Sequence, residues 1–340
     1  MQYRLPAEWE PQSGILIAWP HAATDWAESI DEVESVYTHI VATIIRFQTC
    51  VIATPEPEHV RHYLAEAGVS CERIRLHAIP TNDTWTRDFG PITVYDEQKP
   101  VLLDYVFNGW GMKFDNNLDN QATRLLHELG AFGTIDCQPI DLVLEGGSIE
   151  SDGEGTLLTT TECLLNPNRN PDLDKANVEQ HLREQLGAER ILWLENGYLA
   201  GDDTDSHIDT LARLCLDNTI LYQACDDATD EHFSALDLMR AELHSFRTKA
   251  GSPYQLIPLP WPRAQYEDGQ RLPATYANFL IINGAVLVPI YNDPNDQKAL
   301  DAVARAFPAR EIIGVDCSTL IRQHGSLHCM TMHIPEGVTL

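Results

Sequence analysis

A helix followed by a short strand recurs five times along the chain, and this repeat limits the possible folds more than any other feature. In the first copy, Pro57 stands at a helix start, apolar residues follow at helical spacing, and Gly68 is a stop signal. The predicted helices and their strands are 57–67 with 74–79, 118–129 with 135–140, 174–186 with 191–194, 229–246 with 254–259, and 296–307 with 311–315. This order predicts a fold of the α/β class.

A pair of strand-like runs follows each of the first four short strands. The pairs are 92–95 with 101–105, 148–150 with 156–160, 212–216 with 219–223, and 279–282 with 286–290. Turn signals such as Asp152-Gly153 and Asn283-Gly284 separate the members of a pair. The fifth unit ends after 329–334, but the orphan strand 14–19 can complete it, so the units would close into a ring. An ordinary mixed α/β domain with alternating elements is the alternative.

Reactive side chains fall at the same place in the repeats, in the loop after the short strand or at the start of the hairpin. They are Asp88, Glu145, His207 with Asp209, Asn278 and Cys329. If the repeats surround an axis, these loops converge, and one thiol, one imidazole and three carboxylates line a single pocket. Each residue also has a structural interpretation: turn residues, a cap at Asn278, and a buried thiol at Cys329. The other histidines, His328 included, carry no functional prediction.

The combination favours nucleophilic catalysis on a cation. A cysteine with a separate histidine fits attack by a thiolate. The surrounding carboxylates would oppose thiolate formation unless a cation is bound. A guanidinium is planar, permanently charged and matched to bidentate carboxylates. We therefore expect a small cationic guanidino substrate.

Charge and composition exclude several other classes of protein. Lys and Arg number 23 against 51 Asp and Glu, for a formal net charge of -28. Nucleic-acid binding relies on Lys and Arg side chains that neutralise phosphates, and these are outnumbered here, so we expect no nucleic-acid partner. The eight cysteines contain no C-x-x-C and no metal-ligand spacing, which predicts reduced thiols. Without a secretory h-region or a long apolar run, we expect no membrane association and a cytoplasmic location.

Several motifs together resemble the agmatine deiminases, within the family that also contains the bacterial peptidylarginine deiminase. The resemblance covers nearly the whole chain. Its motifs are Pro6-Ala-Glu-Trp-Glu-Pro11 with Trp19-Pro20, Trp85-Thr-Arg-Asp-Phe-Gly-Pro91, Asn108-Gly-Trp-Gly111, Glu145-Gly-Gly-Ser-Ile149, Asp152-Gly-Glu-Gly-Thr156, Asn166-Pro-Asn-Arg-Asn-Pro171, Asp203-Thr-Asp-Ser-His-Ile-Asp209 and His328-Cys329.

The resemblance implies the pentein fold, a five-bladed α/β propeller of ββαβ repeats with pseudo-fivefold symmetry around a central active site. Residues 1–340 would form a single pentein catalytic domain. By the same resemblance, the roles would be as follows: Cys329 the nucleophile, His207 the general acid/base, Asp88 and Asp209 the guanidinium ligands, Glu145 the carboxylate that orients the histidine, Trp85 the ring beside the alkyl chain, and Asp203 the partner of the distal amine.

The implied reaction is the hydrolysis of agmatine to N-carbamoylputrescine and ammonia through a covalent thiouronium on Cys329, a step in putrescine biosynthesis. It needs no metal and no organic cofactor. The resemblance to the family also implies that the protein forms a homodimer.

Departures from the family pattern leave other functions open. The family's Gly-Gly-Gly-Asn-Ile-His-Cys stands here as Gln323-His-Gly-Ser-Leu-His-Cys329, and Ser206 replaces the glycine before the histidine. The alternatives are deimination of arginine or peptidyl-arginine, amidino transfer, a non-catalytic pentein binding protein, and a Cys-His amidase or peptidase. Recognition of a substrate carboxylate would need an arginine or lysine at the pocket mouth, and Arg87 and Arg169 are candidates.

Overall fold

The strand pairing repeats one pattern in five sheets within residues 3–340, the part of the chain that the computed structural model describes. In the first sheet, β5 (Ile92–Asp96) is antiparallel to β6 (Lys99–Val106), and β6 is parallel to β7 (Asp136–Val143). The others are β8 (Ile149–Ser151), β9 (Thr156–Thr160) and β10 (Arg190–Leu194); β11 (Ala212–Cys215), β12 (Thr219–Gln223) and β13 (Gln255–Leu259); β16 (Leu280–Ile282), β17 (Ala285–Ile290) and β18 (Glu311–Asp316); and β19 (Met332–Pro335), β2 (Gln12–Ala18) and β3 (Thr49–Thr54).

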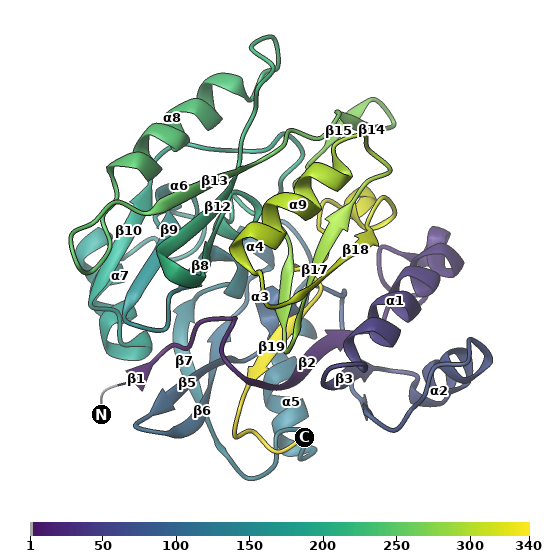
Figure 1. The fold of residues 1–340 in the computed structure, drawn as a ribbon. Helices are drawn as coiled ribbons and strands as arrows, with labels where there is room; N and C mark the ends of the chain where they lie inside the picture. The colour runs from purple at the N-terminus through teal and green to yellow at the C-terminus, as the bar shows by residue number, and fades with distance from the viewer. Residues whose placement is uncertain (1–2) are drawn as a thin grey trace.

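The two ends of the chain share the last of these sheets. Strand β19 pairs antiparallel with β2, and His333 stands opposite Ile15, so the yellow and purple ends of the ribbon lie side by side (Figure 1). The prediction that 14–19 completes the fifth unit is thereby confirmed.

The first predicted helix and strand both form, as α2 (Pro57–Glu66) and β4 (Ile74–Ala78), but they lie in another unit than expected. Strand β4 runs parallel to β3 and extends the sheet of β19 and β2 instead of leading into that of β5. The helix of that unit is α1 (Ile30–Ile44), which the sequence analysis did not predict. Two smaller features are β1 (Tyr3–Arg4), which pairs with β5, and the hairpin of β14 (Gln265–Glu267) and β15 (Gln270–Leu272).

In each of the other four sheets, a longer helix connects the second strand to the third. These helices are α5 (Ala122–Glu128), α7 (Lys175–Leu186), α8 (Phe233–Ser245) and α9 (Asp296–Ala306). Helix α9 shows why they pack: Ala299, Val303 and Ala306 recur at helical spacing and are buried. Helices α1, α2, α5, α7 and α8 lie toward the outside, whereas the short α3 (Thr86–Phe89) lies near the middle (Figure 1).

Short helical turns occupy loops within and between the units: α4 (Gly109–Met112), α6 (Thr161–Leu164), η1 (Ala27–Ser29), η2 (Asp119–Gln121), η3 (Gly146–Ser148), η4 (Ile208–Thr210), η5 (Leu216–Asn218) and η6 (Leu320–Gln323). Backbone contacts join some of these loops across long stretches of sequence. The amide of Arg87 in α3, for example, donates to the carbonyl of Cys329 at 3.1 Å. The repeat therefore brings loops from different units together.

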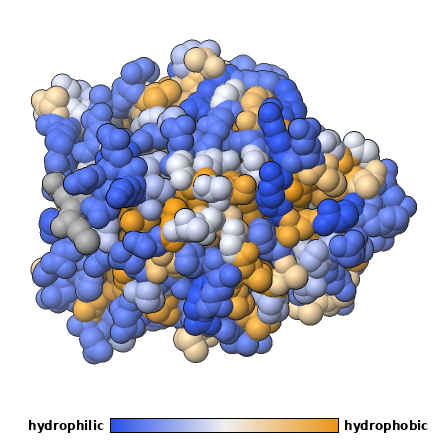
Figure 2. All heavy atoms as spheres, turned by 90° about the horizontal axis from the view of Figure 1, so that it is seen from below, coloured by the Kyte–Doolittle hydropathy of each residue, from blue (hydrophilic) through white to orange (hydrophobic). Residues whose placement is uncertain are grey.

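The surface is largely hydrophilic, as expected from the charge. Figure 2 shows one face on which hydrophilic residues predominate and apolar residues gather near the middle. None of the helices within residues 3–340 has the length and apolar character needed to cross a membrane. All eight cysteines are free thiols, as predicted.

Candidate active site

Cys329 lies in the loop between η6 and β19, and it is held by Asn278. The Asn278 Nδ2 donates to the Cys329 Sγ at 3.2 Å, and the Asn278 Oδ1 accepts from the backbone amides of His328 and Cys329. Only 6% of Cys329 is exposed. Burial, together with Asp209 and Asp88, raises the pKa of the thiol well above its usual value. Before substrate binds, Cys329 is therefore a protonated thiol.

Asp88 is fixed by two donors from separate loops. Its Oδ1 accepts from the amide of Gly147 and its Oδ2 from the Trp110 Nε1, both at 2.9 Å. Trp110 reaches it from a left-handed backbone conformation, with φ at 53°, in the motif that resembles the family's Asn-Gly-Trp-Gly. Burial, with Glu145 close by, raises the pKa of Asp88 to about 7.

His207 is fully buried just before η4, and neither of its ring nitrogens has a hydrogen-bond partner among the described residues. Its Nδ1 lies 3.6 Å from the Asp88 Oδ1. Burial and the positive charges of Arg169 and Lys113 lower its pKa well below the usual value, despite the opposing effect of Asp205. A neutral imidazole with unpaired nitrogens is a group that can accept and return a proton.

Gly147 in η3 lies where these side chains meet. A Cβ at this position would come within 2.6 Å of the His207 Nδ1, 2.8 Å of the Asp88 Oδ1 and 3.2 Å of the Asp209 Oδ2. The glycine therefore leaves the space that lets three predicted site residues converge.

Asp209 has one oxygen engaged and one free. The Oδ2 lies 2.6 Å from the Nδ1 of His328, while the Oδ1 is buried and finds no hydrogen-bond partner within residues 3–340. The Cys329 Sγ lies 3.9 Å from the Oδ2. Burial and Asp88 raise the pKa of Asp209 well above the usual value. A free buried carboxyl oxygen next to the thiol is suited to accept a guanidinium N–H.

Glu145 is held by Arg169 rather than by the histidine. Its Oε1 accepts from the Arg169 Nε at 2.6 Å, and its Oε2 has no hydrogen-bond partner in the part of the chain that the structure describes. Burial raises the pKa of Glu145, and Arg169 opposes that rise. Among the described residues no hydrogen bond joins Glu145 to His207, although the two side chains are neighbours.

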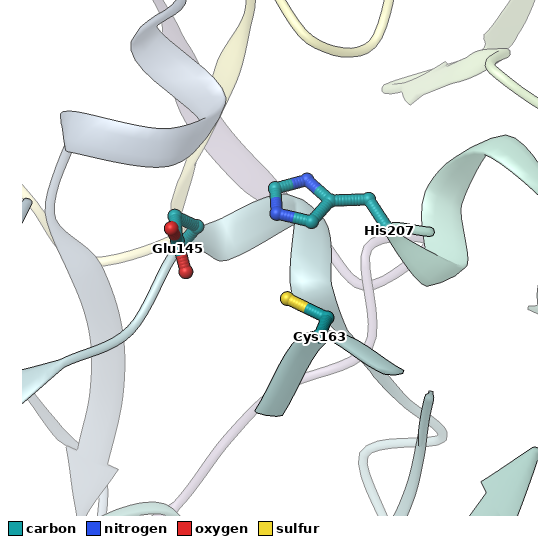
Figure 3. A group of neighbouring side chains, drawn as sticks. All are labelled: Glu145, Cys163 and His207. Atoms are coloured by element: carbon teal, nitrogen blue, oxygen red, sulfur yellow. The ribbon is translucent and has the colours of Figure 1, made fainter. Parts of the chain in front are cut away.

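Glu145 and His207 form a cluster with Cys163 of α6, and Figure 3 shows the three side chains pointing toward one another. Each offers one ligand atom, and these atoms lie within 4.8 Å of one another. A carboxylate, a thiolate and an imidazole are ligands that zinc accepts, so these are the residues that could hold a metal ion. Because burial raises the pKa of Cys163 well above its usual value, binding would have to release the thiol proton.

Cys329 lines a pocket to which five aspartates also contribute. They are Asp25, Asp83, Asp88, Asp202 and Asp203. No lysine or arginine from the described part of the chain contributes to the lining. Burial and Asp25 raise the pKa of Asp83 to about 7. The pocket is therefore built for a positively charged ligand.

Trp85 and Asp203 both line this pocket, as predicted. Trp85 is buried, its Nε1 donates to the Asp83 Oδ2 at 3.2 Å, and Gly325 lies close to its ring. A Cβ on Gly325 would stand 2.3 Å from the Trp85 ring, so this glycine of the altered loop is needed for space. The Asp203 side chain is 41% exposed and stands 3.7 Å from His324.

The two arginines considered for a substrate carboxylate are engaged elsewhere. Arg87 pairs with Glu8 at 3.2 Å, and Arg169 pairs with Glu145 and Asp205. Neither arginine lines the pocket. Carboxylate recognition by either residue is therefore not supported by this geometry.

The structure brings Cys329, His207, Asp88, Asp209 and Glu145 into one buried group. The sequence places Asn278 with this group but gives it no chemical role, and it assigns no function to His328 or Trp110; all three contact the group. Trp110 stands in a quoted motif, and His328 adjoins Cys329, so position in a motif was the available signal.

The chain matches the family described as Porphyromonas-type peptidyl-arginine deiminase over residues 4–335. It is 32% identical to an agmatine deiminase of Pseudomonas aeruginosa (strain LESB58), across 98% of this chain and 95% of that protein. A solved structure from Porphyromonas gingivalis, provisionally named an arginine deiminase, is 47% identical to this chain, with a TM-score of 0.95. The match covers 99% of this chain and 100% of that one. An agmatine deiminase variant from C. jejuni with substrate bound is 38% identical to this chain, with a TM-score of 0.93. The match covers 99% of this chain and 97% of that one.

Proposed function

This chain belongs to the Porphyromonas-type peptidyl-arginine deiminase family, and from that premise we propose that it is an agmatine deiminase. It is a hydrolase that acts on the C–N bond of a guanidino group and converts agmatine and water to N-carbamoylputrescine and ammonia. The product leads toward putrescine, which places the reaction in polyamine biosynthesis.

The observation that carries the choice of substrate is the row of aspartates in the pocket. Agmatine has a guanidinium at one end and an ammonium at the other. The guanidinium would sit at Asp88, and the ammonium would then face Asp25, Asp83 and Asp203. The carboxylate of free arginine would meet the same aspartates and be repelled, since no lysine or arginine of the described residues lines the pocket.

Charge neutralisation connects substrate binding to the start of the reaction. Before binding, the pKa values of Asp88, Asp209 and Cys329 are raised, so the site avoids a cluster of buried negative charges. A guanidinium supplies the missing positive charge and favours the ionised forms of the two carboxyls and the thiol. The substrate therefore promotes formation of its own nucleophile.

The chemical steps follow from this arrangement. Asp88 and Asp209 orient the guanidinium, and the Cys329 thiolate attacks its central carbon to form a tetrahedral adduct. His207, which takes up the proton that the Cys329 thiol loses, donates it to the departing nitrogen, ammonia leaves, and a thiouronium remains on Cys329. His207 then deprotonates water, which attacks the same carbon and releases the ureido product with the free thiol. Glu145 supports proton transfer beside His207, and no metal or organic cofactor takes part.

The remaining expectations belong to the same proposal. Five sheets of one pattern, joined through the two chain ends, support five blades around the site within one domain of residues 1–340. Trp85 packs beside the alkyl chain, and Asp203 binds the distal amine. By resemblance to the family, the protein is a cytoplasmic homodimer whose partner is the small guanidino substrate, without nucleic acid or membrane.

Deimination of arginine or peptidyl-arginine is the second candidate, because the Porphyromonas gingivalis structure bears an arginine deiminase name. The aspartate-lined pocket argues against free arginine more strongly than against a peptide, whose arginine has no free carboxylate. A neutral-amide hydrolase would need oxyanion donors rather than buried carboxylates. A purely binding role leaves the grouping of Cys329, His207 and Asp88 unexplained.

The test measures ammonia and ureido product from agmatine, arginine and an arginine-containing peptide, each beside a Cys329→Ser variant. Turnover of agmatine alone, lost in the variant, supports the proposal. Preference for arginine or the peptide moves the assignment to the second candidate. If none of the three compounds releases ammonia or ureido product, an enzymatic role on guanidino compounds is contradicted.

A further inference from the structure

Cys163 takes no part in the chemistry above, yet it lies beside the two residues that the mechanism uses for proton transfer. It is fully buried in α6, directly after β9. Its Sγ, one oxygen of Glu145 and one ring nitrogen of His207 all lie within 4.8 Å of one another. These three residues are called here the thiol cluster. It joins an unused buried thiol to the catalytic histidine.

Two members of the thiol cluster carry buried polar atoms that lack partners. The two ring nitrogens of His207 and the Oε2 of Glu145 receive no hydrogen bond from, and make none to, any residue between 3 and 340. A buried polar group left unsatisfied costs about 1–3 kcal/mol, so such groups are uncommon without a role. Figure 3 shows that these side chains and Cys163 point toward one another. A cation at their meeting point would supply the partner that the described residues do not.

Hydrogen bonds outside the thiol cluster hold its members in place. The Thr160 Oγ1 accepts from the Cys163 amide at 3.3 Å, and the same hydroxyl donates to the carbonyl of Ser206 at 2.8 Å. Ser206 directly precedes His207, whose amide donates to the Thr204 Oγ1 at 3.1 Å. The thiol and the imidazole are therefore held side by side before any ligand binds, which lowers the cost of ordering them around one.

The types of ligand atom in the thiol cluster select the metal. A thiolate, an imidazole and a carboxylate together suit Zn²⁺, whereas Mg²⁺ and Ca²⁺ prefer oxygen ligands alone. Tetrahedral zinc with bonds of about 2.0–2.3 Å places its ligand atoms about 3.3–3.8 Å apart. Ligand atoms that already lie within 4.8 Å would need to approach by about 1 Å. Three protein ligands leave the fourth position to water.

Two of the ligands bring the negative charge that a divalent cation needs. A Cys163 thiolate and the Glu145 carboxylate together balance the charge of Zn²⁺. The nearby cations Arg169 and Lys113 both pair with Asp205 at 2.8 Å, so part of their charge is already compensated. Because Arg169 engages the Oε1 of Glu145, the Oε2 stays available to the metal.

The loop that carries His207 also borders the substrate pocket. Asp202 and Thr204 line the pocket, and Thr204 is the residue that accepts from the His207 amide. The aspartates of the pocket attract a divalent cation as they attract a cationic substrate. This loop gives a metal ion a route from the pocket to the thiol cluster.

We propose that Glu145, Cys163 and His207 form an inhibitory zinc site. As Zn²⁺ binds, the S–H bond of Cys163 breaks and its proton goes to solvent, while the metal forms bonds to the sulfur, to a Glu145 oxygen and to one ring nitrogen of His207. A neutral imidazole has a single unprotonated nitrogen, so a metal-bound His207 can no longer accept a proton from the Cys329 thiol or from water. This inference rests on the proposed function, because the activity that zinc stops is that of the same site.

The experiment measures agmatine turnover over a series of Zn²⁺ concentrations in the wild type, Cys163→Ala and Cys225→Ala. Cys225 is a half-buried thiol outside the pocket lining, so its variant controls for the loss of one thiol. We expect Zn²⁺ to inhibit the wild type and Cys225→Ala alike, and a chelator to restore turnover. In Cys163→Ala the Zn²⁺ concentration for half-inhibition should rise about tenfold or more. No inhibition of the wild type, or equal sensitivity of all three proteins, overturns the proposal.

Cobalt binding tests the same site without turnover, and Cys163→Ser, which keeps the side-chain volume, replaces Cys163→Ala if that variant does not fold. Co²⁺ held by a thiolate has an intense charge-transfer band in the near ultraviolet. Cys329→Ser lacks the nucleophile but keeps the thiol cluster, so Co²⁺ should produce the band there and not in the double variant Cys329→Ser/Cys163→Ser. A band that is absent from Cys329→Ser, or unchanged in the double variant, overturns the zinc site. If the wild type turns over no guanidino compound, the proposed function fails, and the cobalt band alone decides on the zinc site.

Discussion

Trp110 donates a hydrogen bond from its Nε1 to the Asp88 Oδ2 at 2.9 Å, and it does so from a left-handed backbone conformation. A bulky residue at positive φ is uncommon and costs free energy, so the surrounding structure must impose it. The contact it secures is with the carboxyl proposed to grip the guanidinium. Strain in the loop thus has an identifiable benefit at the site.

Replacing Trp110 with phenylalanine should therefore impair substrate binding more than folding. The ring volume is partly kept, but the Asp88 Oδ2 loses its donor while the Gly147 amide still holds the Oδ1. Hydrogen bonds to charged groups contribute about 1.5–3 kcal/mol, which predicts a fall of about 10- to 100-fold in kcat/KM for agmatine. Steady-state kinetics checks this.

The matched control is Trp193→Phe. Trp193 in β10 also donates from its Nε1 to a carboxylate, Glu179, but it lies outside the pocket lining. An equal loss of kcat/KM in both variants would contradict a specific role for Trp110.

The close approach of Gly147 to three site residues gives a second prediction. Gly147 does not have a positive φ, so alanine meets no backbone strain there, but its Cβ would stand 2.6 Å from the His207 Nδ1. We expect Gly147→Ala to displace His207 or Asp88 and to lower kcat by about 100-fold or more, since small misplacements of reacting groups have effects of this size.

Gly130→Ala separates this steric effect from a general cost of adding a methyl group. Gly130 has a φ of +78° and open space around its Cβ position. That variant should lose about 1 kcal/mol of unfolding free energy with unchanged kcat. Normal kcat in Gly147→Ala would show that the site tolerates the extra carbon.

The order of elements and the grouping of Asp88, His207, Asp209 and Cys329 could be predicted because their signals are local. Turn residues between apolar runs mark each hairpin, and equivalent loops of a repeat meet if the units close. Helix α1 was missed although Val33, Tyr37, Ile40 and Ile44 are spaced for one buried face. The placement of β4 in the sheet of β3 depends on pairing between strands, which no local pattern specifies.

The contacts that complete the site could not be predicted, because they join residues far apart in sequence. Asn278 holds Cys329 from another sheet unit, and Glu8 reaches His328 from the opposite end of the chain. The resemblance implies that Glu145 orients His207, and the structure adds that the Glu145 Oε1 accepts from the Arg169 Nε. The resemblance identified the reactive residues but not the partners that hold them.

Asp83 supplies a third prediction, about the far end of the pocket. Asp83→Asn removes a half-buried carboxyl beside Asp25 that, once ionised, would pair with the distal ammonium of agmatine. We expect KM for agmatine to rise about tenfold with little change in kcat, because the lost interaction lies away from the reacting carbon. Relative activity on arginine should increase, since the pocket then repels a carboxylate less.

The exposed Asp172→Asn serves as the control for loss of one negative charge from the protein. Its KM should match the wild type. If Asp83→Asn lowered kcat and left KM unchanged, the assignment of the ammonium to this end of the pocket would be wrong.

The raised pKa of Asp88 makes the last prediction, on stability against pH. Its folded pKa is about 7, against an ordinary value of about 3.9 in the unfolded chain. Because the folded value is the higher one, the protonated carboxyl stabilises the fold fully below about pH 4, and this contribution is lost as pH rises to about 7. The wild type should therefore lose stability relative to Asp88→Asn across this range, by at most about 1.4 kcal/mol per pH unit.

Urea unfolding of both proteins from pH 4 to pH 8 measures this difference, and subtracting the variant cancels the other titrating groups to first order. Saturating agmatine should weaken or reverse the trend, because a bound guanidinium favours the ionised carboxylate. A stability difference that is flat across this range without agmatine would show that Asp88 is already ionised in the free protein. In that case the substrate would not be what creates the negative charge at this position.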